Sequence, residues 1–391
     1  MKNILISGAS IAGTATAYWL RRHGFNPTVV ERAPAIRTGG YKVDIRGAAL
    51  DVIERMGLLD AVRARATGMR QAHYYDRRGR RKASMDADLF GGRTGDDAEI
   101  MRGDLNELLH DLTRDDVEYL FDDSITGIGA DGLVTFERAA PRRFDLIVGA
   151  DGVHSTTRRL AFGDESQFLR HLGHYISIST VPNTLALDHE EAVHAAPGRT
   201  ANVYSTARGA GAKALFMWAS PRLDYDHRDV ARQKDLLADA LAGMEWEVPG
   251  LLDAVRGSDD FYFDSMSQIH MERWSTGRVV LVGDAAYCAS PASGQGTSLA
   301  LVGAYVLAGE LATGGGADGY ERELRPFVAA NQALGPANVK GMVMPSRLAI
   351  GIQLTALRLL PRLPGRDKMI DRIAGPIHRA ATAISLKDYV E

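Results

Sequence analysis

Residues 3–13 read NILISGASIAG, and the chain then forms a second apolar run, TVVE, at residues 28–31. A short apolar run before a glycine turn predicts a buried parallel strand. Apolar residues at helical spacing over 11–23 predict a helix, which Gly24 is suited to end. The stretch therefore predicts a βαβ unit of the Rossmann type, and this unit indicates the fold class of the protein.

The glycine turn of this unit is suited to a dinucleotide. Gly8 permits a tight turn and Gly13 a close approach of helix and strand, while free N–H groups at the helix start face a pyrophosphate. Ser10 replaces the middle glycine of G-x-G-x-x-G and is interpreted as tolerated. Glu31 is placed to accept ribose hydroxyls. An ordinary strand, turn and helix is the alternative. The candidate binding residues here are Gly8, Ser10, Ile11, Ala12, Gly13, Glu31 and Arg32.

Composition limits the class of protein. With 391 residues, 45% of them hydrophobic, the chain can bury a large core in two domains or one elaborated domain. The net charge of −3 gives no overall case for binding nucleic acid or an anionic membrane. Cys288 is the only cysteine, which excludes an internal disulfide, and the histidines lack metal-ligand spacing. Without a signal peptide or a long uncharged span, we expect a cytoplasmic protein with no metal site and no membrane insertion.

A second domain is predicted from strand-rich segments. Residues 71–85 carry a turn signal at Asp76–Gly79 between two strands, which predicts a hairpin contributed to another sheet. Residues 166–271 predict an antiparallel sheet with helical cover. Residues 91–97 predict a mobile loop, and the apolar segment 349–360 is expected to pack on the body. The predicted division is 1–70, 97–165 and 272–312 for the nucleotide-binding domain, 71–96 and 166–271 for the second domain, and 313–391 for a C-terminal helical region.

Two further buried strands end in glycine and an acid, at Asp151-Gly152 and at Gly283-Asp284. Since the carboxyl ends of parallel strands line one crevice, three such turns can together hold a single long cofactor. Gly294-Gln295-Gly296 then precedes a long helix, where backbone N–H groups and a helix N-terminus favour an anion.

These three ordered motifs resemble the FAD-dependent aromatic hydroxylases of the p-hydroxybenzoate hydroxylase type, and especially the branch of tetracycline-inactivating flavin monooxygenases. The resemblance covers most of the chain. It implies an α/β fold, with a Rossmann-like FAD-binding domain, an inserted mainly antiparallel substrate domain and C-terminal helices. The chain departs from the family pattern at Tyr287, Ser290, Ser293 and Ser298. The cofactor-binding residues that the resemblance implies are Arg46, Arg102, Asp151, Asp284, Pro291, Gly294, Gln295, Gly296 and Thr297.

The activity implied by the resemblance is that of a monooxygenase with bound FAD and transient NADPH or NADH. A flavin 4a-hydroperoxide would transfer one oxygen of dioxygen to a phenolic or polyketide-like small molecule, so no catalytic nucleophile is expected. Baeyer–Villiger oxygenation or a flavin-dependent reduction can use the same frame. A non-catalytic flavin-binding protein is an alternative of another class. An NAD-dependent dehydrogenase would leave residues 283–296 unexplained. The oligomeric state and the substrate are not predicted.

Overall fold

The computed structural model describes residues 2–37, 39–207, 210–359 and 366–389. One half of the molecule is built on a six-stranded sheet in the order β17-β18-β11-β1-β2-β7, in which only β17 is antiparallel to its neighbour. Its strands are short and almost wholly buried at the centre, as parallel strands covered on both faces require. The strands are β1 (Asn3–Ser7), β2 (Asn26–Glu31), β7 (Glu118–Phe121), β11 (Leu146–Gly149), β17 (Ser275–Thr276) and β18 (Val279–Leu281).

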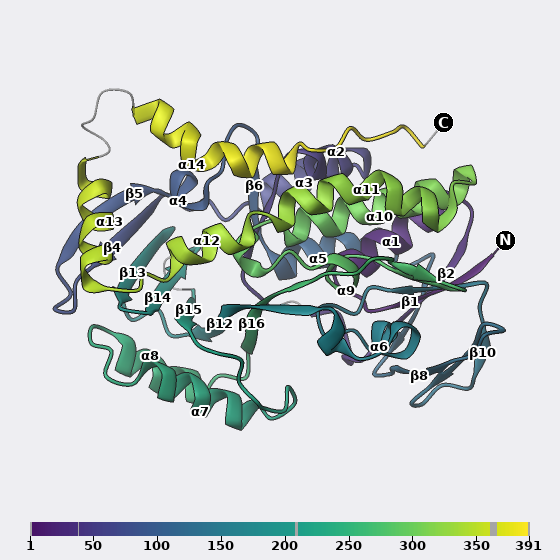
Figure 1. Ribbon diagram of the computed structural model, residues 1–391, viewed down its shortest axis with the longest axis horizontal. Helices are drawn as coiled ribbons and strands as arrows, with labels where there is room; N and C mark the ends of the chain where they lie inside the picture. Colours follow the sequence, from purple (N-terminus) through teal and green to yellow (C-terminus); the bar gives the residue numbers. More distant parts are fainter. Residues whose placement is uncertain (1, 38, 208–209, 360–365, 390–391) are drawn as a thin grey trace.

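Helices from both ends of the chain form a layer over this sheet (Figure 1). α1 packs against α10, and α10 packs in turn against α11 and α2. Among the described residues, α10 is the only helix long and apolar enough to cross a membrane, yet 78% of it is buried inside the protein. It is therefore a core helix. The layer comprises α1 (Ile11–Arg22), α2 (Ala48–Arg55), α3 (Leu59–Ala64), α5 (Arg102–Asp111), α10 (Gly296–Thr313), α11 (Gly316–Gln332) and α14 (Arg366–Ala381).

The other half is a seven-stranded sheet in the order β16-β12-β15-β14-β13-β4-β5. All its pairings are antiparallel except that of β13 with β4. The predicted hairpin is present as β4 and β5, and it extends this sheet at one edge. The strands are β4 (Gln71–Tyr75), β5 (Arg81–Asp86), β12 (Leu169–Val181), β13 (Glu190–Ala196), β14 (Arg199–Ser205), β15 (Ala212–Ala219) and β16 (Phe261–Ile269).

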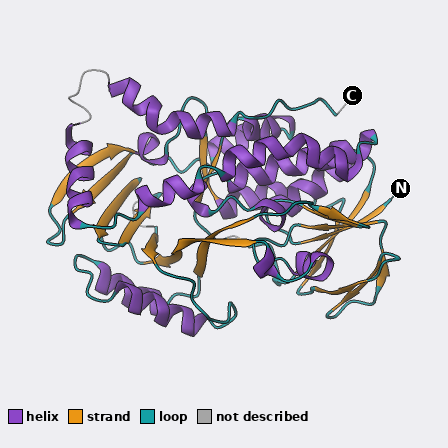
Figure 2. Cartoon of the chain, in the orientation of Figure 1, coloured by secondary structure: helices purple, strands orange, loops and turns teal. Residues whose placement is uncertain are grey.

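The two faces of the seven-stranded sheet pack differently. α7 (Val230–Leu241) and α8 (Val248–Arg256) lie along one face, where they enclose a separate hydrophobic core (Figure 2). The opposite face meets the turn at Pro291–Ser293 and α12 (Gly335–Met342) through a smaller apolar cluster. Two hydrophobic cores support the predicted division of the chain into domains, whose boundaries stay a prediction.

Smaller elements join the two halves. β3 (Lys42–Ile45) pairs with β6 (Ala98–Met101), and a three-stranded sheet, β10-β9-β8, lies beside the six-stranded one. Asp131-Gly132, a residue pair typical of hairpin turns, joins β8 to β9 in this small sheet. The remaining elements are β8 (Ile125–Ile128), β9 (Leu133–Phe136), β10 (Arg142–Arg143), α4 (Ala87–Gly91), α6 (Thr156–Phe162), α9 (Asp284–Tyr287) and α13 (Arg347–Leu359).

Two sequence expectations need adjustment. The segment 91–97 is tied down by Arg93, whose buried guanidinium pairs with Asp44, Asp88 and Glu99. It therefore has more structure than the glycine content of the loop suggested. α13 lies against β5, as expected for packing on the body, but none of its described residues is buried. Leu360, the last residue of the predicted apolar segment, lies outside the described residues.

Candidate functional site: a crevice formed by three glycine turns

The first glycine turn is held in a conformation that only glycine satisfies. Gly8 has a φ of +105°, and a Cβ there would lie 2.6 Å from the carbonyl oxygen of Ala150. A Cβ on Gly13 would lie 1.8 Å from the carbonyl oxygen of Gly8. The first turn thus touches the end of β11, and the N-terminus of α1 faces the crevice with Ile11 and Ala12 buried behind it.

Ser10 has a partner that the sequence did not reveal. Its Oγ accepts a 2.7 Å hydrogen bond from the guanidinium of Arg102, the first residue of α5. A Cβ on Gly40, which has a φ of +131°, would lie 3.3 Å from the Cβ of Arg102, so the arginine stem passes close to that glycine. Ser10 is therefore more than a tolerated replacement for glycine, because it orients Arg102 beside the turn.

Glu31 clamps the turn to the end of β2. One carboxylate oxygen accepts the N–H of Ala9 at 2.8 Å, and the other accepts the N–H of Ala33 at 2.9 Å. The carboxylate is only partly buried, so lone pairs remain for ribose hydroxyls. Arg32, the neighbouring candidate, is exposed.

The second turn is organised by its acid. Asp151 accepts the backbone N–H of Thr157 at 2.8 Å and its hydroxyl at 2.9 Å, which ties the strand end to the start of α6. Arg158 is fully buried and donates to the carbonyl oxygen of Ala285 at 2.9 Å. These side chains connect the second turn to the third. Their predicted contact with the cofactor stays a prediction.

The third turn places an acid in the crevice. Gly283 has a φ of +65°, and a Cβ there would lie 2.9 Å from that of Ala12 in the first turn. The side chain of the next residue, Asp284, is exposed on the wall of the crevice. Because protein surrounds the crevice, the carboxyl is nevertheless partly desolvated, which raises its pKa. Its Oδ1 lies 3.9 Å from the position of a Cβ on Gly296, at the start of α10.

The turn before α10 uses serines where the family pattern has other residues. Ser290, at a φ of +77°, accepts the N–H of Ala292 through its Oγ at 3.3 Å. Ser293 in turn accepts the N–H of Gln295 at 3.1 Å. Ser298 accepts the backbone N–H of Arg46 at 3.3 Å. Local hydrogen bonds of Ser290 and Ser293 therefore hold the turn that begins at Pro291, whereas Ser298 ties α10 to Arg46.

Gln295 has a buried side chain whose polar atoms lack hydrogen-bond partners among the described protein atoms. These atoms are the amide nitrogen and the amide oxygen. Such a pair of orphan groups is costly unless a ligand satisfies it. Gly294 beside it has open space where a Cβ would lie, and Thr297 follows in the first turn of α10. This edge of the crevice therefore fits a ligand with both donors and acceptors.

Arg46 braces the segment 91–97. Its guanidinium is almost fully buried and donates to the carbonyl oxygens of Gly91 and Gly92 and to Asp44, at 2.6 to 2.7 Å. Its Nε has no hydrogen-bond partner among the described protein atoms, and its backbone N–H donates to Ser298. Its predicted contact with the cofactor stays a prediction.

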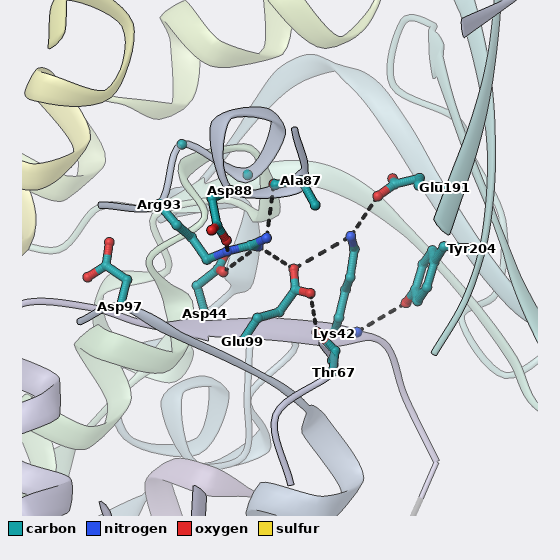
Figure 3. Close-up of polar contacts among 12 residues, drawn as sticks. Lys42, Asp44, Thr67, Ala87, Asp88, Arg93, Asp97, Glu99, Glu191 and Tyr204 are labelled. Carbon is teal, nitrogen blue, oxygen red and sulfur yellow. Dashed lines mark hydrogen bonds and ion pairs between the residues drawn. The ribbon is translucent and has the colours of Figure 1, made fainter. Parts of the chain in front are cut away.

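An ion-pair network around Lys42 and Glu99 connects the two halves of the protein (Figure 3). Lys42 Nζ lies 2.6 Å from Glu191 of β13 and 3.5 Å from Glu99 of β6. Its backbone N–H donates to Tyr204 of β14 at 3.1 Å. Burial alone would lower the pKa of Lys42, but the two glutamates outweigh it and raise the pKa. The network therefore fixes the seven-stranded sheet over the crevice.

Tyr287 and Cys288 belong to the packing around the crevice. The Tyr287 hydroxyl lies 3.0 Å from that of Tyr320, and a Cβ on Gly303 of α10 would lie 2.0 Å from it. The tyrosine that replaces the family histidine thus points between α10 and α11. Cys288 is buried, burial raises the pKa of its thiol, and its Sγ lies 3.6 Å from the carbonyl oxygen of Ser267.

An apolar cluster covers the third turn from the side of the seven-stranded sheet. Tyr41 and Tyr262 face each other with ring centroids 5.9 Å apart, and burial raises the pKa of both hydroxyls. Such a surface suits a flat, largely apolar molecule. The other members are Ile176, Ile178, Leu215, Met217, Met266, Ala292, Val339 and Val343.

The crevice has the features that an FAD molecule needs. Three of its glycines, Gly8, Gly13 and Gly283, leave no room for a Cβ. An arginine and a helix N-terminus at the first turn suit phosphates, and the amide of Gln295 is unpaired among the described protein atoms. Acids stand at the ends of β2 and β18 for cofactor hydroxyls. The residues present therefore fit the cofactor.

Comparison with known proteins agrees with this geometry. The model of the FAD binding domain family matches residues 1–331. An uncharacterized protein of Mycobacterium tuberculosis is 49% identical over 351 residues, covering 87% of this chain and 94% of the relative. A flavin-dependent monooxygenase of Legionella longbeachae is 41% identical over 85% of this chain and 87% of its own length. The crystal structure of tetracycline destructase Tet(51) superimposes with a TM-score of 0.86 at 35% identity, covering all of both chains. The chain therefore belongs to the FAD binding domain family and is a flavin-dependent monooxygenase.

Proposed function

We propose that the protein uses NADPH or NADH and dioxygen to hydroxylate a phenolic or polyketide-like small molecule. The observation that carries this proposal is the direct contact of three glycine turns around one crevice, with an apolar cluster above the third. The turns suit FAD, and the cluster suits a flat organic substrate beside it. Bound FAD would supply the redox chemistry, since reduced flavin activates dioxygen.

The chain's own residues would bind the cofactor and control charge at its ring. We assign Arg102, oriented by Ser10, to the phosphates, and Glu31 and Asp284 to hydroxyl groups of the cofactor. The N–H groups at Gly294–Gly296, at the positive end of α10, favour negative charge at the pyrimidine edge of the reduced ring. The unpaired Gln295 amide supplies a donor and an acceptor there.

The apolar cluster would orient the substrate and exclude water from the reacting atoms. Tyr41 and Tyr262 both belong to this cluster, and the raised pKa of each hydroxyl keeps it protonated at neutral pH. The Tyr262 hydroxyl donates to Asp264 Oδ2 at 3.4 Å, so Tyr41 is the candidate donor to the substrate. A protonated tyrosine can donate a hydrogen bond to a substrate oxygen. This arrangement needs no nucleophilic side chain.

The test is turnover with candidate substrates. The purified protein should carry flavin absorbance, and an accepted phenol or polyketide should accelerate NADPH oxidation and gain one oxygen by mass spectrometry. Both reactions add one oxygen, so the product structure decides: a new hydroxyl group on carbon indicates hydroxylation, whereas an ester or lactone formed by insertion of oxygen next to a carbonyl indicates a Baeyer–Villiger reaction. Substrate consumption without oxygen gain would indicate a reductase, and bound flavin without any NAD(P)H oxidation would indicate a non-catalytic binder.

A further inference from the structure

A second cluster of polar side chains lies next to the crevice, where three distant segments meet. Its member Asp264 accepts the Tyr262 hydroxyl at Oδ2, 3.4 Å away, and the backbone N–H of Ser265 at Oδ1, 2.7 Å away. His154 follows the second glycine turn, Asp264 lies in β16, and His227 lies in the loop before α7. His154 Nε2 is 3.2 Å from Asp264 Oδ1, and the rings of His154 and His227 have centroids 3.9 Å apart. One ligand atom from each of the three lies within 4.8 Å of the others.

We propose that His154, His227 and Asp264 bind a divalent transition-metal ion of the zinc class. Zinc lies about 2.0–2.1 Å from imidazole nitrogen and carboxylate oxygen, so two ligands of a tetrahedral site are about 3.3 Å apart. The observed 3.2 Å between Nε2 and Oδ1 matches one edge of such a site. His227 is exposed and lies on a loop, so a small movement of its ring completes the set.

The other nitrogen of His154 is held as in known zinc sites. Metal-binding histidines usually donate their second ring N–H to a carboxylate, which fixes the ring and its tautomer. Here Nδ1 lies 2.9 Å from Glu165 Oε1, and Arg158 donates to the other oxygen of Glu165 at 2.8 Å. Nε2 is thereby directed toward Asp264.

The cluster opens onto a hollow that leaves room for a further ligand. The hollow has a volume of about 340 Å³, and its walls include His154, His227, Glu165 and Tyr225. Two imidazoles and one carboxylate favour zinc-like ions over magnesium or calcium, which prefer oxygen alone. A site with three protein ligands would keep a fourth position for water or a small molecule.

A proton competes with the metal ion for the imidazole of His154. Burial alone would lower the pKa of His154, but its hydrogen bonds to Asp264 and Glu165 outweigh burial and raise the pKa to about 9. A metal ion must displace this proton, which weakens its apparent affinity near neutral pH.

Zinc chloride titrated calorimetrically into chelator-treated holoenzyme tests the proposal without any turnover. We expect one ion per chain in the wild type, and at least about 100-fold weaker binding in His227→Ala, more than the loss typical for an outer-shell partner. Because His227 is exposed, this variant should fold. Glu165→Gln should weaken binding about 10–100-fold.

The matched control is His171→Ala, which removes another histidine from the wall of the same hollow. It should bind zinc as the wild type does. Cobalt bound in place of zinc should give the visible absorption of a tetrahedral site, and His227→Ala should abolish it. No zinc binding by the wild type, or equal binding by the wild type and His227→Ala, would overturn the proposal and leave a protonated His154 between two carboxylates. Both results are independent of the proposed monooxygenase reaction.

Discussion

The first glycine turn and the turn before α10 differ in what their glycines face. In the first turn, a Cβ on Gly13 would come within 1.8 Å of the neighbouring backbone, so the protein itself demands glycine. In the turn before α10, a Cβ on Gly294 would meet nothing within 4 Å. We expect a ligand to use that open space, and serines hold the surrounding backbone. A glycine can thus be required by the fold or by the ligand, and only its surroundings distinguish the two.

Replacement of Gly13 by alanine should have the largest effect. The added Cβ meets backbone that cannot move without separating α1 from β1, so we expect a loss of about 3 kcal/mol or more in the free energy of unfolding. Denaturant unfolding of the apoprotein measures it. If Gly13→Ala is as stable as the wild type and loses only flavin, then Gly13 serves the ligand alone and the comparison fails.

Asp284→Ala should mainly affect the cofactor. A hydrogen bond to a charged group is worth about 1.5–3 kcal/mol, so FAD should bind about 10- to 150-fold more weakly. Because the carboxylate is open to the crevice and its pKa is raised by desolvation, its removal should not destabilise the apoprotein. Titration of apoprotein with FAD gives the affinity, and Asp284→Asn is the matched control that keeps the shape. Unchanged flavin retention in Asp284→Ala would make this acid structural.

The sequence predicted the backbone of the site better than its side chains. Glycine turns after apolar strands depend on local spacing, and all three turns lie together as the spacing indicated. The partner of Ser10 is Arg102, which lies on another helix, and no local pattern indicates such a pairing. The guanidinium of Arg46 points toward the segment 91–97 because the carbonyl oxygens of Gly91 and Gly92 accept its hydrogen bonds there.

The seven-stranded sheet was predicted only in part for a similar reason. The sequence indicates its hairpin and, by strand-like runs at 175–181, 201–206 and 214–219, the strands β12, β14 and β15, but β13, β16 and α8 were not predicted. The parallel pairing of β13 with β4 joins segments far apart in the chain. Strand order of this kind depends on packing over the crevice, which a single sequence does not display. The proposed metal ligands were not predicted for the same reason, since they come from three separate segments.

Gly294→Ala should have a smaller effect than Gly13→Ala on stability and should act mainly on the flavin. The residue has a φ of +66°, and alanine in that conformation costs about 1–2 kcal/mol. The apoprotein should therefore fold, with a slightly lower free energy of unfolding. FAD should bind more weakly, because the new methyl group occupies space under the ring. Equal losses of stability in Gly13→Ala and Gly294→Ala would remove the distinction between the two turns.

Ser10→Gly should have the smallest effect. It restores the usual glycine of the turn and removes a Cβ near the phosphates, which favours FAD. It also removes the 2.7 Å hydrogen bond that orients Arg102, which disfavours FAD. A hydrogen bond to a charged group contributes about 1.5–3 kcal/mol, but Arg102 can still reach the phosphates without the serine. The two effects oppose each other, so the dissociation constant for FAD should change by less than about tenfold, or 1.4 kcal/mol. A double-mutant cycle with Arg102→Lys separates them: coupling between the two positions supports the orienting role of Ser10, whereas strict additivity would show that the serine is merely tolerated.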